Sequence, residues 1–186
     1  VYEVPVHRKN PFLWGSARRQ VKRILQHEGA DIVHVRSRAP AWIALPAANS
    51  LGIATVSTVH SKFAPANIFK KIYNGKMLKA DRVIAISHFV ENEIFTHYGK
   101  SGVAEKLSVI HRGVDLGMFD PKAVNQQRII AEADRLGLPD DKSIIMLPAR
   151  ATSWKGHEIL IQALAQISDK DAILMLLGIE DGPPAY

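Results

Sequence analysis

The sequence contains no cysteine among its 186 residues. Disulfide bonds, thiol catalysis and cysteine-ligated metal sites are therefore excluded. It also lacks any run of about 18 apolar residues, the length that a membrane-spanning helix needs. The absence of cysteine agrees with a reducing compartment. We therefore expect a cytoplasmic protein, and we leave open a peripheral contact with the inner face of a membrane.

Acidic side chains are scarce in the first part of the chain. Residues 1–115 hold 17 Lys and Arg against 8 Asp and Glu, a net charge of +9, whereas residues 116–186 hold 7 against 10, a net charge of −3. A basic surface indicates an anionic partner such as phospholipid, lipopolysaccharide or nucleic acid. A soluble enzyme with a basic isoelectric point explains the charge equally well, and both interpretations stay open.

The two ends of the sequence look cut. There is no Met at position 1, and the strand-like run Val1–Val6 begins at once. The last residues follow an apolar strand, where a helix would be expected. We therefore predict a fragment with an unpaired sheet edge, through which copies of the chain could associate.

Strand and helix patterns alternate along the whole chain, which predicts an α/β fold with parallel sheets. In such sheets, ligands bind beyond the carboxyl ends of the strands. The charge shift and a long connector predict two units that meet near residue 115. The expected strands are 1–6, 31–35, 53–60, 82–86, 107–110, 143–148 and 172–177. The expected helices are 14–28, 40–50, 67–79, the segment between an N-cap at Ser87 and Gly99, 125–136 and 157–167.

Three motifs occur in a characteristic order. They are Ala80–Ser87 (ADRVIAIS), Val109–Asp115 (VIHRGVD) followed by Phe119 and Pro121, and Ala149–His157 followed by an apolar helix. Together they resemble the GT4-like family of GT-B glycosyltransferases, in which these segments read AD-x-VI-x-x-S, VIPNGVD and GRL-x-x-x-KG. The chain departs from that pattern at His111, Arg112 and Ala149, where the family usually has Pro, Asn and Gly.

The resemblance implies two Rossmann-like parallel-sheet domains of GT-B type, both incomplete in this chain. Residues 1–115 would be the later part of the N-terminal, acceptor-side domain. Residues 116–186 would be the linker and the first part of the C-terminal, nucleotide-sugar-side domain. It implies retaining transfer of a sugar from a nucleotide-diphosphate sugar to a hydroxyl acceptor. The family's glycine-rich loop and paired glutamates would lie outside the chain, so we expect the fragment alone to be inactive.

Arg150 and Lys155 follow the strand predicted at 143–148, and they resemble the family's two diphosphate-binding cations. Fixed cations stabilise the negative charge that a diphosphate leaving group gathers as its bond to the sugar breaks. Arg offers a planar fork to phosphate oxygens and Lys a point charge. The plain alternative is two surface cations near a helix start.

His60 ends the strand predicted at 53–60, where a His of the family faces the transferred sugar. We predict it as the catalytic residue, and the alternative is a structural His at a strand end. Gly113 lies in the turn between the units, where Gly allows a positive φ or a close approach of the backbone to the diphosphate. A plain turn Gly is the alternative.

Gly178 and Glu180 follow the last strand and resemble the family's nucleotide-base loop, with an ordinary turn as the alternative. Arg36 and Arg38 follow the strand at 31–35 on the expected acceptor side, where they could meet an anionic acceptor or face solvent. The basic helix face of Arg18, Arg19, Lys22 and Arg23 is either solvated or a membrane-docking surface.

Asp169-Lys170-Asp171 matches a metal-binding Asp-x-Asp pattern but precedes a strand, which is the wrong end of the sheet for a ligand site. We expect no metal and no cofactor beyond the nucleotide-sugar donor itself. The partners expected are that donor and a glycan or glycolipid acceptor.

The basic first part and the motif pattern suggest that the acceptor belongs to bacterial envelope glycan, such as lipopolysaccharide. One alternative is another GT-B enzyme, a sugar-nucleotide epimerase or a phosphorylase. The other is a basic nucleic-acid-binding α/β module. We expect no nucleic acid, because the sequence lacks the interleaved aromatic and basic residues that single-strand binders use.

Overall fold

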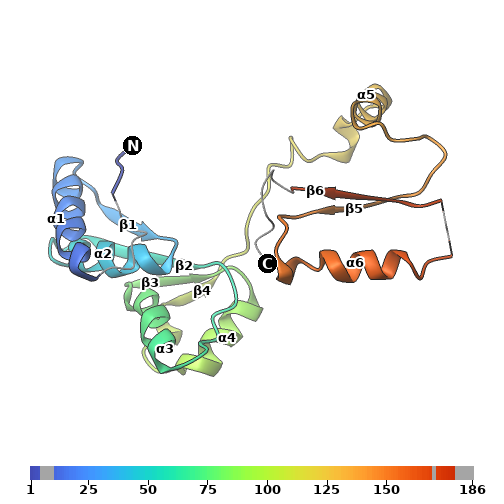
Figure 1. The fold of residues 1–186 in the computed structure, drawn as a ribbon. Helices are drawn as coiled ribbons and strands as arrows, with labels where there is room; N and C mark the ends of the chain where they lie inside the picture. The colour runs from blue at the N-terminus through green and yellow to red at the C-terminus, as the bar shows by residue number, and fades with distance from the viewer. Residues whose placement is uncertain (5–10, 169–170, 179–186) are drawn as a thin grey trace. The chain divides into compact units, whose positions relative to one another are not determined.

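The structure is a computed structural model that describes residues 1–4, 11–168 and 171–178, of which 11–13 are described by backbone alone. The chain divides into two compact units, residues 1–114 and 115–186, drawn from blue to green and from yellow to red in Figure 1. Each unit has its own parallel sheet. The assignment of the units to acceptor and donor sides stays a prediction.

The first unit alternates strands and helices around a four-stranded sheet of order β1-β2-β3-β4, in which all neighbours are parallel. The parallel α/β architecture predicted from the alternation is thereby confirmed. Its elements are α1 (Pro11–His27), β1 (Ile32–Val35), α2 (Arg38–Asn49), β2 (Ala54–Val59), α3 (Ile68–Gly75), the 3-10 helix η1 (Lys76–Lys79), β3 (Arg82–Ala85), α4 (His88–Tyr98), η2 (Ala104–Lys106) and β4 (Leu107–Val109).

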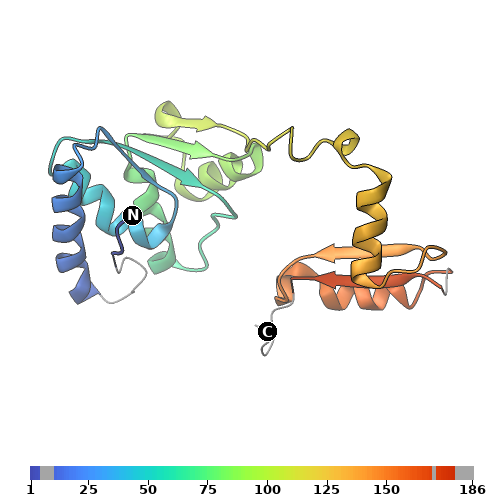
Figure 2. The same ribbon diagram turned by 90° about the horizontal axis from the view of Figure 1, so that it is seen from above.

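The core of the first unit lies between this sheet and helices α2 and α4. Helix α2 packs on β1 and β2, α4 packs on β3 and β4, and α1 covers α2 (Figure 2). Val83 and Ala85 of β3 are completely buried, as expected for a central strand of a parallel sheet. Phe63, in the loop after β2, is completely buried as well and joins the same core, so this loop is anchored to the sheet.

Capping residues set the helix ends in both units. The Ser87 side chain accepts a hydrogen bond from the backbone N–H of Val90, which confirms the predicted N-cap of α4. Gly99 ends that helix, and Asn125 caps α5 (Gln126–Leu136) by accepting from the N–H of Arg128. Gly137 ends α5 in the left-handed conformation with φ of +63°.

The second unit has a two-stranded parallel sheet of β5 (Ile144–Pro148) and β6 (Ile173–Leu177). Its remaining elements are η3 (Pro121–Ala123), α5 (Gln126–Leu136), η4 (Ser153–Lys155) and α6 (His157–Leu164). The crossover from β5 to β6 runs through η4 and α6. The first turn after β5 therefore carries the Arg150 and Lys155 segment.

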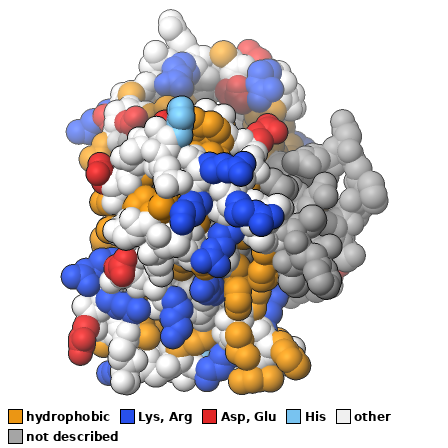
Figure 3. Space-filling view, turned by 90° about the vertical axis from the view of Figure 1, so that its left-hand side faces the viewer, with side chains coloured by type: hydrophobic (Ala, Val, Ile, Leu, Met, Phe, Trp, Pro, Cys, Tyr) orange, Lys and Arg blue, Asp and Glu red, His pale blue; other side chains and the backbone are white. Residues whose placement is uncertain are grey.

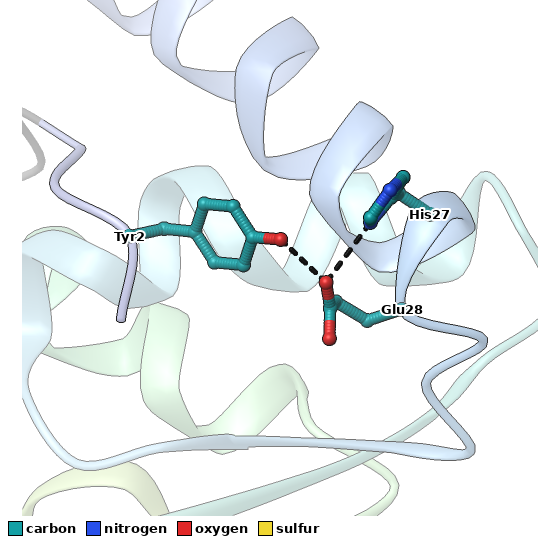
Figure 4. A network of polar contacts seen from close by, with 3 residues as sticks. All are labelled: Tyr2, His27 and Glu28. Atoms are coloured by element: carbon teal, nitrogen blue, oxygen red, sulfur yellow. Dashed lines mark hydrogen bonds and ion pairs between the residues drawn. The ribbon is translucent and has the colours of Figure 1, made fainter.

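The prediction of a strand at Val1–Val6 is wrong for the part that the structure describes, because residues 1–4 form no strand. They lie instead against the end of α1, where the Tyr2 hydroxyl donates to the Glu28 carboxylate (Figure 4). His27 contacts the same carboxylate through Nδ1 at 2.9 Å. Alternation alone failed here because a strand forms only where a neighbouring strand pairs with it.

Helix boundaries differ from the predictions where local chemistry intervenes. The helix predicted at 67–79 is split, because α3 ends at Gly75 and the chain continues as the 3-10 helix η1. Helix α6 ends at Leu164 rather than at residue 167. None of the described helices is long and apolar enough to cross a membrane.

Candidate functional site

The carboxyl ends of the four parallel strands meet at one edge of the first sheet, which is where an open α/β sheet binds its ligands. Arg36 follows β1, His60 follows β2 and Ser87 follows β3. Pairing between β3 and β4 continues as far as Ile110, whose N–H donates to the Ala85 carbonyl at 2.9 Å. This pairing holds the residues that follow β4 at the same edge.

The imidazole of His60 lies between two guanidinium groups. Arg36 Nε lies 3.3 Å from His60 Nε2, and a terminal nitrogen of Arg112 lies 2.6 Å from His60 Nδ1. An arginine is always charged and only donates, whereas a neutral imidazole has a single accepting nitrogen. The ring can therefore accept a hydrogen bond from only one of the two arginines at a time.

This environment favours the neutral form of His60. The pKa of His60 is lowered from its ordinary value, first by burial of the ring and then by the positive charges of Arg112 and Arg36. A neutral imidazole can donate to, or accept from, a sugar hydroxyl, as the catalytic role predicted for His60 requires. That role stays a prediction.

Arg38 lies beside the same edge, at the start of α2. One of its terminal nitrogens donates to the Lys62 carbonyl at 3.1 Å, and its guanidinium carbon lies 5.5 Å from the centre of the Phe63 ring. Its Nε is buried and has no hydrogen-bond partner among the described residues. Arg36, Arg38 and His60 line one small cavity of about 120 Å³, so three of the predicted site residues are brought together.

In the second unit, the chain leaves β5 at Pro148 and reaches Arg150 two residues later. Arg150 and Lys155 are both exposed, and neither forms an ion pair within the described part of the chain. The Lys155 ammonium lies 4.3 Å from the centre of the Trp154 ring. Two cations without a carboxylate partner thus follow β5, as the diphosphate prediction requires, but their joint binding of a diphosphate stays a prediction.

Gly178 is tightly packed against the Arg150 loop. It has a φ of +87°, and a Cβ placed on it would lie 3.3 Å from the carbonyl carbon and oxygen of Ala149. The Ala149 N–H donates to the Leu177 carbonyl at 2.9 Å, and His157 Nε2 lies 3.2 Å from the Ala149 carbonyl. The backbone just before Arg150 is therefore fixed by β6 on one side and by α6 on the other.

Two expectations about glycine and the base loop have different outcomes. Gly113 does not have a positive φ, and a Cβ placed there would meet no atom within 4 Å, so the conformational reason given for this glycine is wrong. A close approach of its backbone to a diphosphate stays a prediction. Glu180 lies outside the described residues.

Two residues matter more than the sequence indicated. In the sequence, Arg112 is only a departure from a family motif, yet it contacts His60 in the structure. His157 was part of a motif without a role of its own, yet it is buried and contacts the loop that carries Arg150. Within the described residues, no cluster of three or more metal-ligating side chains occurs.

The architecture places the protein in a class. Parallel α/β sheets of this arrangement are found in the GT-B glycosyltransferases, and the described units have that fold. A solved glycosyltransferase from Rickettsia africae ESF-5 superimposes with a TM-score of 0.75 at 33% sequence identity, covering 96% of this chain and 46% of that one. HepE from Anabaena, solved in complex with UDP, superimposes with a TM-score of 0.70 at 22% identity, covering 87% of this chain and 44% of that one.

Sequence comparison gives the family. The family model of Glycosyltransferase Family 4 matches residues 1–117. D-inositol 3-phosphate glycosyltransferase 1 of Catenulispora acidiphila is 28% identical over 153 residues, which is 76% of this chain and 35% of that protein. The chain belongs to Glycosyltransferase Family 4, and it spans less than half the length of each of these relatives.

Proposed function

We propose that the protein transfers a glycosyl group from a nucleotide-diphosphate sugar to a hydroxyl of its acceptor. The observation that carries the proposal is the pair Arg150 and Lys155, which follows β5 without a carboxylate partner in the described part of the chain. Family membership supports the same activity. A structural neighbour supports a nucleotide-sugar donor, since HepE was solved in complex with UDP and with UDP-glucose.

Arg150 and Lys155 would contribute to the reaction by electrostatic stabilisation. When the bond between the sugar and the diphosphate breaks, negative charge accumulates on the leaving group, and cations fixed beforehand stabilise it. The backbone before Arg150 is already held by Leu177 and His157. The backbone of this loop therefore needs little ordering when the donor binds, which lowers the cost of placing the two cations beside the leaving group.

Three finer features belong to this proposal. Transfer proceeds with retention of the anomeric configuration, His60 contacts the transferred sugar, and the acceptor belongs to a bacterial envelope glycan. The net positive charge of residues 1–115 supports an anionic acceptor of that kind. Product analysis by NMR distinguishes retention from inversion, and it also distinguishes glycosyl transfer from epimerisation or phosphorolysis.

Titration of UDP, GDP and ADP onto the protein tests the donor site. We expect one of them to bind, and we expect Lys155→Ala to weaken that binding by about tenfold or more, since hydrogen bonds to charged groups are worth about 1.5–3 kcal/mol. Lys142→Ala is the matched control, because Lys142 lies before β5, at the opposite end of the strand, 3.6 Å from Asp171. Equal losses in the two variants, or no binding at all, would refute the proposal.

A peripheral membrane contact through the first unit is part of the same proposal. On α3, Ile68, Phe69 and Ile72 are all largely exposed, with Phe69 at 80%, and Lys70 and Lys71 lie between Phe69 and Ile72. Figure 3 shows Lys and Arg side chains gathered beside hydrophobic ones on the side of the molecule that carries α1. Exposed apolar side chains flanked by lysines suit the interface of an anionic bilayer.

The basic surface continues from α3 towards α1. The pKa of Lys76 is lowered, first by burial and then by the positive charges of Arg18 and Lys79. In α1, Arg18 donates to the Pro46 carbonyl of α2 at 3.3 Å. Lys76 also lies 5.5 Å from the centre of the Trp42 ring. Arg18 of the predicted basic helix face and Lys76 of η1 therefore both contact α2, and both add positive charge to the surface proposed to meet an anionic membrane.

A further inference from the structure

The cavity at the carboxyl ends of β1 and β2 has the lining of an anion site. Its volume is about 120 Å³, and its lining includes Arg36, Arg38 and His60 together with Ser37, Thr58 and Ser61. A water molecule occupies about 30 Å³ of the liquid. The space therefore suits one phosphate-sized or carboxylate-sized group with its nearest waters.

The arginines around this cavity form no close ion pair with a carboxylate in the described part of the chain. The Glu93 carboxylate, nearby, accepts from the Ala64 N–H at 3.2 Å. The segment 32–80, which supplies the cavity lining, contains seven Lys or Arg and no Asp or Glu. Like charges held together in a partly buried place destabilise the fold unless an opposite charge joins them.

The hydrogen-bonding pattern points the same way. His60 faces one guanidinium at each ring nitrogen, although it can accept from only one of them. Arg38 Nε is buried without a partner among the described residues. The N–H donors of these arginines therefore outnumber the acceptors beside them. An oxyanion would supply several acceptors at one point.

We propose that this cavity binds an anionic group of the acceptor, a phosphate monoester or a carboxylate, through Arg36 and Arg38, with Arg112 completing the charge around His60. The proposal rests on the proposed function, because it takes the diphosphate of the donor to be bound by Arg150 and Lys155 in the second unit. The guanidinium fork matches two oxygens of such a group, which a neutral sugar lacks. The site therefore selects acceptors by charge, and it places the acceptor beside His60.

The test compares glucose 6-phosphate and inorganic phosphate with neutral glucose by isothermal titration calorimetry. We expect saturable binding of the two anions and none of glucose. Arg36→Met and Arg38→Met should each weaken anion binding by about tenfold. Arg36→Lys, which keeps the charge and loses the fork, should weaken it less. The matched control is Arg82→Met, because Arg82 begins β3 at the opposite edge of the sheet, and it should leave anion binding unchanged.

A second measurement does not depend on any variant. The ring ¹⁵N resonances of His60 in the unaltered protein should shift on addition of glucose 6-phosphate or phosphate and stay unchanged with glucose. Unshifted His60 resonances, or equal loss of binding in Arg82→Met, would overturn the proposal.

A UDP titration separates the two proposals. Arg36→Met should leave UDP affinity intact while Lys155→Met lowers it. If Arg36→Met weakens UDP and not glucose 6-phosphate, the cavity serves the donor and the acceptor proposal is wrong. If UDP fails to bind at all while the phosphates still shift His60, the donor site fails and the anion site stands.

Discussion

The carboxylate of Asp81 accepts two hydrogen bonds from Thr55, one from the backbone N–H at 2.8 Å and one from the hydroxyl at 2.7 Å. The Thr55 hydroxyl in turn accepts from the Asp81 N–H at 3.0 Å. Thr55 is buried in β2, and Asp81 lies just before β3. This pair therefore ties the starts of two neighbouring strands, at the edge opposite to the candidate site.

Replacing Asp81 should destabilise the first unit without touching the site. Asp81→Ala leaves the buried Thr55 hydroxyl and N–H without their acceptor, which costs about 1–3 kcal/mol of unfolding free energy. Urea denaturation measures the loss. Asp31→Ala is the control, because Asp31 is an exposed carboxylate for which the structure shows no hydrogen bond within the described residues. An equal effect of the two changes would contradict the structural role of Asp81.

The same pair predicts a dependence of stability on pH. The hydrogen bonds from Thr55 lower the pKa of Asp81 below its ordinary value of 3.8. The carboxylate is therefore bound more strongly in the folded state, and its contribution is complete above that value. It is lost as the pH falls from about 4 through the lower folded pKa. The difference in unfolding free energy between the unaltered chain and Asp81→Ala should shrink over this acidic range, and a constant difference would refute the assignment.

Gly178 gives a prediction that links packing to the donor site. Gly178→Ala should cost about 1–2 kcal/mol for its positive φ, and more because the new Cβ would press on the Ala149 carbonyl at 3.3 Å. Displacement of Ala149 moves the loop that carries Arg150. We therefore expect both a loss of stability in chemical denaturation and a weaker affinity for the nucleoside diphosphate.

The matched control for this change is Gly137→Ala at the end of α5. Gly137 has a similar positive φ of +63°, but a Cβ placed there would meet no atom within 4 Å. Gly137→Ala should lower the unfolding free energy only by the cost of placing alanine at a positive φ, and it should leave nucleotide affinity unchanged. If both alanine variants bind the nucleoside diphosphate like the unaltered protein, the contact between Gly178 and the Arg150 loop does not position that loop for nucleotide binding.

Features with a local physical cause could be predicted from the sequence. Ser87 caps α4 as expected, and α5 ends at Leu136, where the predicted helix 125–136 ends, because Gly137 adopts the left-handed conformation. Each effect depends only on residues within four positions of the helix end. The meeting of Arg36 with His60 follows from topology, because parallel strands bring the residues after their ends to one edge. Topology therefore predicts which edge of the sheet holds the site, but it does not predict which side chains contact one another there.

Contacts that depend on loop paths could not be predicted. Arg112 reaches His60 across 52 positions of the chain, and no periodicity in the sequence encodes the turn after β4 that allows it. The bonds between Asp81 and Thr55 span 26 positions, and the motif containing Asp81 indicated a family without indicating a role. The strand expected at the N-terminus failed for a related reason, because pairing partners are a property of the whole fold.

The membrane contact proposed for α3 can be tested by sedimentation with vesicles. We expect the protein to bind phosphatidylglycerol vesicles and not phosphatidylcholine vesicles, and we expect binding to fall with salt because surface charges are screened. Each lysine near an anionic surface contributes about 1 kcal/mol, so Lys70→Gln with Lys71→Gln should lower partitioning by roughly tenfold or more.

Phe69→Ser tests the apolar part of the same surface. Phe69 is 80% exposed, and its removal should weaken binding to phosphatidylglycerol vesicles because its ring no longer leaves water. Phe89→Ser is the matched control, since Phe89 on α4 is 61% exposed and lies outside α3 and η1. Binding that Phe69→Ser and Phe89→Ser reduce equally, or that neither reduces, would show that α3 does not enter the bilayer interface. Retention on phosphatidylcholine would show that the lysines of α3 do not select the surface, because a neutral bilayer offers them no opposite charge.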